Sequence, residues 1–233
     1  LVSPIMPLYA RSFGVSLALV AMVTTSSAIG RLLSDIPLGF LADRIGRRPL
    51  TIMGPLLIVV SAVLSGLAQS FYELLVYRVL TGVAMSMWMI ARQAMIADSI
   101  DPSIRGRVMS TFQGINMVGM ATGPAVGGIV AEVWELRAPF FFYGLSTFAS
   151  SIACFVFVKE TSPKRRVGER RSAPKMDLRA ILGFMTFPIL MAAFTNLSNH
   201  IRLAGRSYLI PIFGDSLGLG AGEIGLVLSA STV

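Results

Sequence analysis

The residues whose types and spacing could do chemistry stand in a short basic segment between two long apolar runs. Residues 39–49 read GFLADRIGRRP, so one acid lies among three arginines. Such an acid can pair with a guanidinium or meet the positive end of a neighbouring helix. The chemistry that this segment predicts is a reversible charge contact, which can latch a gate. Its residues are Gly39, Asp43, Arg44, Gly46, Arg47 and Arg48.

Each residue type in this segment has a physical reason. Gly39 and Gly46 allow a tight turn and a close approach of two helices, because glycine lacks a Cβ atom. Asp43 can pair with Arg47 across that turn. A simpler interpretation is that the arginines only fix the orientation of the chain in a membrane, but this explains neither the acid nor the glycines. We therefore interpret the segment as a gate.

Other kinds of chemistry lack their residues in this sequence. It shows no paired carboxylates inside an apolar run, no nucleophile beside a base and no phosphate-binding glycine loop, so we do not expect an enzyme. The single cysteine, Cys154, lies inside an apolar run, and the single histidine is His200, so we find no Cys/His cluster for a metal. We expect neither a metal nor a cofactor.

The rest of the sequence indicates that membrane helices carry these residues. Of 233 residues, 54% are hydrophobic and 14% are charged, and the mean hydropathy is +0.72, which is too apolar for a soluble domain. About twenty apolar residues cross a bilayer as a helix. We predict an all-α, polytopic transmembrane bundle with helices near 15–37, 49–68, 72–97, 104–130 and 138–158, a seventh span at about 179–212 and an eighth from about 222.

The ends and the centre of the sequence suggest how this bundle is divided. Residues 1–10 read as the end of an earlier helix, and the chain stops at Val233 within an apolar run, so we expect a fragment. Residues 159–178 are rich in charge, proline, serine and glycine and are predicted to be a linker. The predicted domains are an N-terminal bundle at 1–158, this linker, and the start of a second bundle at 179–233.

Basic residues are distributed unevenly along the chain. The loops containing 44–48, 92–107 and 159–179 hold 14 of the 20 lysines and arginines. Because cytoplasmic loops are enriched in basic residues, we place these three segments in the cytoplasm. The net charge of +8 is then explained by the membrane, without nucleic acid as a partner.

Residues 39–48 resemble the signature of the major facilitator superfamily (MFS) between its second and third helices: Gly, three residues, Asp, Arg, any residue, Gly, Arg, and Arg or Lys. All six positions match. The resemblance implies an MFS-type fold, here incomplete, of two six-helix bundles around a cavity that opens to each side in turn. It also implies that Asp98, at the end of the fourth helix, is a partner for Arg47. A plain helix-end carboxylate is the alternative.

Two further segments resemble signatures of the same family. Arg78 and Gly82 match part of a signature in the fourth helix, although Thr81 replaces its usual glutamine. An arginine inside a membrane helix marks a cavity or relay unless it snorkels to the interface. The fifth helix resembles the antiporter signature, in which small residues allow close packing and proline favours a bend. Its residues are Gly119, Gly123, Pro124, Gly127 and Gly128.

Two other groups of polar residues lie in predicted spans. Arg31 and Asp35 stand four residues apart on the second helix and are predicted to pair with each other. A polar stripe on the seventh span would suit an anionic or carboxylate-bearing substrate, since guanidinium offers paired donors, unless the helix has already left the membrane near residue 200. The candidate cavity residues there are Asn196, Asn199, Arg202 and Arg206.

Together these features predict a secondary transporter of a small solute that works by alternating access, as an exporter or a proton-coupled antiporter. Two alternatives stay open: a receptor or sensor that keeps the fold without moving solute, and a symporter or uniporter for an organic anion. We expect a multi-pass protein of the plasma membrane, or of the bacterial inner membrane, that works as a monomer when full length. Its expected partners are the lipid bilayer and a small-molecule substrate.

Overall fold

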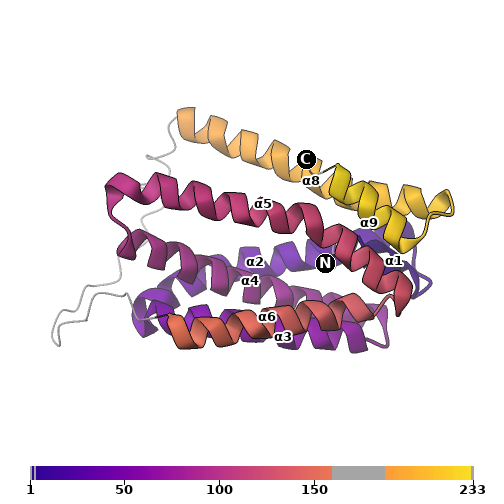
Figure 1. The fold of residues 1–233 in the computed structure, drawn as a ribbon, viewed down its shortest axis with the longest axis horizontal. Coiled ribbons are helices and arrows are strands. Elements are labelled where there is room, and N and C mark those ends of the chain that lie inside the picture. Colours follow the sequence, from indigo (N-terminus) through magenta and orange to yellow (C-terminus); the bar gives the residue numbers. More distant parts are fainter. Residues whose placement is uncertain (1, 3, 159–186, 232–233) are drawn as a thin grey trace. The chain divides into compact units, whose positions relative to one another are not determined.

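A computed structural model describes residues 2, 4–158 and 187–231. The elements in this part of the chain are helices (Figure 1): α1 (Met6–Arg11), α2 (Leu17–Ile45), α3 (Arg47–Leu67), α4 (Phe71–Ser99), α5 (Pro102–Val133), α6 (Ala138–Phe157), α8 (Phe187–Ser216) and α9 (Ala221–Ala230). Five of them, α2 to α6, are long and apolar enough to cross a membrane. The prediction of an all-α, membrane-spanning bundle is confirmed.

The chain divides into two compact units. The first comprises residues 1–162 and 208–233, and the second comprises residues 163–207, of which 187–207 are described. Helix α8 therefore passes from the second unit into the first, and each unit is described by itself below. The predicted linker at 159–178 lies outside the described residues, so the predicted domain boundaries stay predictions.

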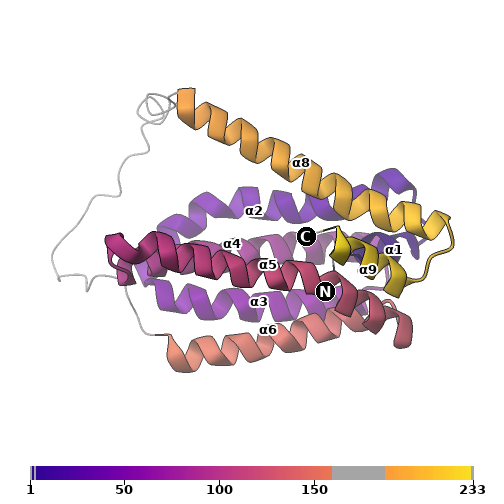
Figure 2. The same ribbon diagram turned by 45° about the horizontal axis from the view of Figure 1, so that its top comes forward.

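Helix α4 is the centre of the packing in the first unit. It packs against both α2 and α3, and α3 also packs on α6 (Figures 1 and 2). Glycines let the backbones of α2 and α4 approach. A Cβ atom built on Gly82 would lie 2.0 Å from the carbonyl oxygen of Ser27, and one built on Gly30 would lie 2.2 Å from the carbonyl oxygen of Val79. The two helices therefore touch through backbone at two points.

The second helix is longer than the sequence predicted. It runs to Ile45 instead of ending near residue 37, because Pro37 lies inside it without ending it. Membrane helices tolerate such prolines, since neighbouring groups can satisfy the freed backbone. Gly39 consequently lies within α2 with open space around it, and Gly46, with φ of 93°, makes the turn into α3. The predicted role in the turn is confirmed for Gly46 and wrong for Gly39.

The connection between α4 and α5 is also shorter than predicted. Only Ile100 and Asp101 separate the two helices, whereas the predicted helices at 72–97 and 104–130 left a connection of six residues. Asp101 begins α5 by accepting a hydrogen bond from the backbone N–H of Ser103 at 2.8 Å. Hydrogen bonds from the Ser103 hydroxyl and backbone N–H lower the pKa of Asp101 below its ordinary value. The carboxylate that starts the helix is thus favoured in its charged form.

The orientation of these helices is a prediction that cysteine labelling can check. Ser99 is the exposed last residue of α4, near the basic segments, and Glu135 is exposed at the other end of the unit, after α5. With Cys154 replaced by serine, we expect Ser99→Cys to react with an impermeant maleimide from the cytoplasmic side and Glu135→Cys from the opposite side. Labelling of both residues from one side would contradict the topology.

Candidate functional site

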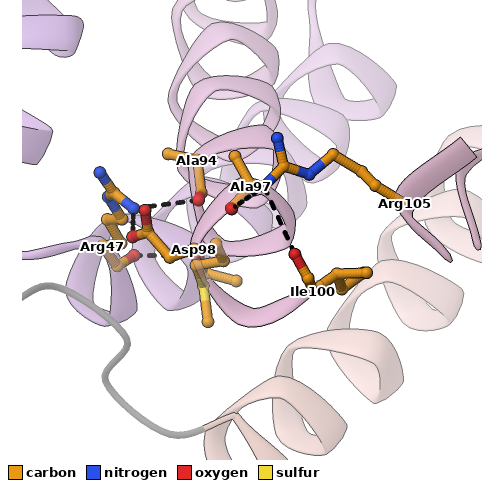
Figure 3. A network of polar contacts seen from close by, with 8 residues as sticks. Arg47, Ala94, Ala97, Asp98, Ile100 and Arg105 are labelled. Carbon is orange, nitrogen blue, oxygen red and sulfur yellow. Dashed lines mark hydrogen bonds and ion pairs between the residues drawn. The ribbon is translucent and has the colours of Figure 1, made fainter. Parts of the chain in front are cut away.

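An ion pair joins the start of α3 to the end of α4. Arg47 is the first residue of α3, and its guanidinium pairs with the carboxylate of Asp98 in the last turn of α4 (Figure 3). The same guanidinium donates a hydrogen bond to the carbonyl oxygen of Ala94 at 3.0 Å. The Arg47 and Asp98 side chains are only 16% and 27% exposed. Such a pair is screened less than one in open water, so it holds the two helix ends together.

The sequence offered two partners for Arg47, and the structure selects one of them. The pairing with Asp98 is confirmed. Asp43 lies in the last turn of α2 and is exposed, as is Arg44, so the predicted pair between Asp43 and Arg47 is wrong. The physical reason is that the guanidinium of Arg47 turns to the end of α4, where it meets the Asp98 carboxylate and the Ala94 carbonyl oxygen. A gating role for Asp43 and Arg44 stays a prediction.

Two more arginines at this end act on helix C-termini. Arg48 donates a hydrogen bond to the carbonyl oxygen of Phe155, in the last turn of α6, at 3.3 Å. Arg105 reaches back from α5 to the carbonyl oxygens of Ala97 at 2.7 Å and Ile100 at 3.4 Å (Figure 3). The last carbonyls of a helix lack partners within the helix and carry partial negative charge, so a guanidinium stabilises them. Sequence reasoning did not assign Arg105 to this role.

The predicted pair within α2 is wrong, because both side chains turn to α4. Asp35 accepts a hydrogen bond from the hydroxyl of Ser86. The Arg31 guanidinium contacts the sulfur of Met89 at 3.5 Å. The four-residue spacing predicted a contact along α2. Because α2 packs closely on α4, Asp35 contacts Ser86 and Arg31 contacts Met89 instead.

The two relay candidates on α4 meet different surroundings. Gly82 is buried where α4 touches α2, so its observed role is to let the helices approach. Arg78 is half-buried, and its Nε atom is buried with no hydrogen-bond partner in the described part of the chain. A relay role for Arg78 stays a prediction.

An arginine that the sequence analysis counted only for topology lies between two aromatic rings. The guanidinium carbon of Arg92 is 4.3 Å from the ring centroid of Trp88, on α4, and 4.6 Å from that of Phe112, on α5. Cation–π contacts of this length are favourable, and they join α4 to α5. The spacing of four residues between Trp88 and Arg92 was the available signal, whereas the part of Phe112 appears only in three dimensions.

The last third of α5 packs against α9 through small residues. A Cβ atom on Gly128 would lie 2.4 Å from the carbonyl oxygen of Ala221, and one on Gly225 would lie 2.5 Å from the carbonyl oxygen of Pro124. Both ribbon views show α9 beside this end of α5 (Figures 1 and 2). Close packing of the predicted signature is confirmed for its C-terminal part, since Gly127 is buried as well.

The N-terminal part of the signature behaves differently. Gly119 is exposed, with open space where a Cβ atom would stand, so its predicted packing is wrong; Gly123 is half-buried. The contact lies nearer the C-terminal end of α5 than the four-residue spacing suggested, because the glycines of α9 meet α5 at Pro124 and Gly128. The partner of this stripe could not be read from the glycine pattern itself.

Two polar contacts accompany this packing at the end of the unit away from Arg47. Arg11, at the end of α1, pairs with Asp215, near the end of α8. Glu132, near the end of α5, accepts a hydrogen bond from the backbone N–H of Gly222 at 3.0 Å, in the first turn of α9. We call these two contacts and the Gly128–Gly225 packing the outer seam. It joins α1 and α5 to α8 and α9.

The polar residues predicted to line a cavity from α8 belong to the second unit. Arg202 donates a hydrogen bond to Oδ1 of Asn199 at 3.1 Å, and both side chains are exposed. Arg206 is half-buried. The side chain of Asn196 lies outside the described part. Their role in substrate binding stays a prediction.

The sequence of this chain is similar to those of membrane transporters. The family model of the Major Facilitator Superfamily matches residues 1–233. The chain is 22% identical over 239 residues to an uncharacterized MFS-type transporter of Methanocaldococcus jannaschii, covering 100% of this chain and 60% of the relative. It is 30% identical over 184 residues to the multi-drug resistance efflux pump PmrA of Streptococcus pneumoniae, covering 76% of this chain and 45% of the pump.

The fold also resembles a solved structure. The peptide transporter POT, in a crystal structure in complex with sulfate, superposes with a TM-score of 0.61 at 16% identity, over 90% of this chain and 48% of that one. At this identity the likeness concerns the fold. The chain spans about half the length of the curated relatives that it matches.

Proposed function

Because the chain belongs to the Major Facilitator Superfamily, we propose that the protein carries a small solute across its membrane by alternating access, as an exporter or antiporter. Alternating access requires contacts that close one end of the path while the other end opens. Polar contacts at the two ends of the first unit support this proposal. One is the pair of Arg47 with Asp98, and the other is the outer seam, with its pair of Arg11 and Asp215.

The observation that carries the proposal is the Arg47–Asp98 pair. Both charges stand at helix ends where the helix dipole opposes them, since Arg47 begins α3 and Asp98 lies in the last turn of α4. Neither position is favourable without its partner. The pair also keeps 16% and 27% of its two side chains exposed, so water can solvate the charges when they separate. A contact at this position can break and re-form during transport, as a latch must.

The direction of transport, as export or exchange, forms part of the same proposal. A relative carries the name of a multidrug efflux pump, and the signature on α5 resembles that of antiporters. The close backbone contact between Gly128 and Gly225 leaves no room for solute between the helices at that point. Such a contact restricts leak, which favours exchange. Protons are the proposed coupling ion and the plasma membrane the proposed location.

Solute exchange in liposomes tests the proposal. The purified full chain would be reconstituted, and counterflow would be measured for ethidium, benzoate and a neutral dipeptide. We expect exchange of at least one solute above that of empty liposomes. Asp98→Asn should exchange it roughly tenfold more slowly, because the loss of about 1.4 kcal/mol from the Arg47–Asp98 contact corresponds to a factor of ten. Glu135→Gln, an exposed acid-to-amide change, is the matched control. A folded protein that exchanges none of the solutes would favour a receptor.

Proton coupling has its own expected result. With a solute that exchanges, an imposed pH gradient should drive accumulation above the equilibrium level, and a protonophore should abolish the accumulation while leaving counterflow intact. This separation follows because counterflow needs only the conformational change, whereas accumulation needs the gradient. Accumulation that persists with the protonophore would contradict coupling to protons.

A further inference from the structure

Two aromatic rings of the first unit hold a positive charge. The guanidinium carbon of Arg92 lies 4.3 Å from the ring centroid of Trp88 and 4.6 Å from that of Phe112. Arg92 forms no ion pair with a carboxylate of the described residues, where the pairs found involve Arg11 and Arg47. Because the face of an aromatic ring attracts a cation, these two rings make a site that already holds one.

The two rings differ in how firmly they are held. A Cβ atom built on Gly54 of α3 would lie 2.8 Å from the backbone nitrogen of Trp88, so α3 and α4 touch through backbone at this tryptophan. Phe112 is 37% exposed and belongs to residues 111–120 of α5, all of which are exposed. Packing therefore fixes the position of Trp88, whereas the ring of Phe112 is accessible to a second molecule.

The cation that now occupies the rings is able to leave them. Arg92 is half-buried and stands seven residues before Ser99, the last residue of α4, which is about 10 Å along a helix. A side chain of this length can carry its charged head to the water at the end of a membrane helix while its stem stays among apolar groups. The guanidinium of Arg92 is thus a tethered ligand that another cation can displace.

We propose that Trp88 and Phe112 form the binding site for an organic cation, and that Arg92 occupies this site when no substrate is bound. The positive group of the substrate takes the place of the guanidinium against the two rings. Ile115 is 69% exposed and stands one turn beyond Phe112 on α5, so it offers a surface to the apolar body of the same molecule. This inference rests on the proposed function and names the substrate class of the transporter.

A tethered competitor gives this site a distinctive response to mutation. Arg92→Ala keeps both rings and removes the competing cation, so the affinity for an added cation should rise by the fraction of time that Arg92 blocks the site. If Arg92 only joins α4 to α5, the same change should leave the affinity unchanged or lower it, because the two rings would lose the group that holds them together. The sign of the change therefore separates the two roles of Arg92.

The probe is phenylguanidinium, with phenylurea as its neutral analogue of the same shape. Calorimetry on the purified full chain should give saturable binding of phenylguanidinium, about fivefold tighter than that of phenylurea. Arg92→Ala should tighten the binding of phenylguanidinium about fivefold, and Arg92→Gln should do the same if the alanine variant does not fold. Arg107→Ala removes an exposed arginine of α5, whose charge is screened by water, so the affinity should stay within about twofold.

Two further variants locate the bound cation. In the Arg92→Ala background the competitor is absent, so Phe112→Leu should weaken binding about fivefold, since leucine is apolar but has no ring face. Phe157→Leu, at a phenylalanine that is 80% exposed, is the matched control and should change nothing. With Trp134→Phe, Trp88 is the remaining tryptophan of the sequence, and its emission should change with the same affinity that calorimetry gives.

Three results would overturn the site: no saturable binding of phenylguanidinium to the Arg92→Ala protein, an affinity that Arg92→Ala and Arg92→Gln leave unchanged or lower, or binding that does not alter the emission of Trp88. Failure here and failure of the proposed function are distinguishable. Counterflow of another solute without binding of phenylguanidinium removes the cation site alone, whereas binding of phenylguanidinium without counterflow of any solute removes transport.

Discussion

Gly82→Ala should lower the free energy of unfolding by about 1–3 kcal/mol, the usual cost of overpacking a well-packed interior. The new methyl group would lie 2.0 Å from the carbonyl oxygen of Ser27. That oxygen belongs to the backbone of α2 and cannot swing aside as a flexible side chain can. The two helices must separate, which also weakens the neighbouring contact at Gly30. The melting temperature of the purified protein in detergent measures the loss.

Two glycines of the same chain provide matched controls for this change. Gly39 in α2 and Gly119 in α5 both have open space where a Cβ atom would stand. Alanine is the better helix former by about 1 kcal/mol, so Gly39→Ala and Gly119→Ala should melt at or above the temperature of the unchanged protein. Equal melting of all three variants would mean that α2 and α4 do not touch at Gly82.

Exchanging the two charges of the latch should produce the second large effect. In Arg47→Asp with Asp98→Arg, an acid would begin α3 and an arginine would lie in the last turn of α4, where the helix dipoles favour each charge. The reversed pair should therefore be more stable than the original by about 1 kcal/mol, with each dipole contributing roughly 0.3–1 kcal/mol. If the pair must break during transport, the same change should slow counterflow about fivefold.

The two single changes complete this experiment. Arg47→Asp alone and Asp98→Arg alone each bring two like charges together at the helix ends, so both should melt lower than the exchanged pair. Melting temperature and counterflow rate would be measured on the same preparations. A reversed pair that melts higher and also transports at the original rate would leave the ion pair as a structural contact only.

The sequence was sufficient to predict the positions of most helices and one contact of the candidate gate, the pair of Arg47 with Asp98. Apolar runs of membrane length predicted α3 to α6 to within a few residues, because hydrophobic length is a local property. The end of α2 was missed, since proline ends most helices and Pro37 does not end this one. Asp98 was found as the partner of Arg47 only through the family resemblance, because the two residues are 51 positions apart in the sequence.

Contacts that depend on the packing of helices could not be predicted. Whether a glycine meets a backbone is decided by its neighbour, so Gly128 touches α9 while Gly119 meets nothing. The position of Arg92 against Phe112 likewise requires the placement of α5. Composition and spacing identify residues that are able to make such contacts. The partner helix decides which of them do.

Reversible locking of the outer seam tests alternating access most directly. Arg11 and Asp215 form an ion pair there, so cysteines at both positions, with Cys154 replaced by serine, lie within reach of a short bis-methanethiosulfonate cross-linker. We predict that cross-linking abolishes counterflow in proteoliposomes and that a reductant restores it, while each single cysteine treated in the same way transports normally. A fully cross-linked protein that still exchanges solute at the original rate would contradict a mechanism in which this end must open.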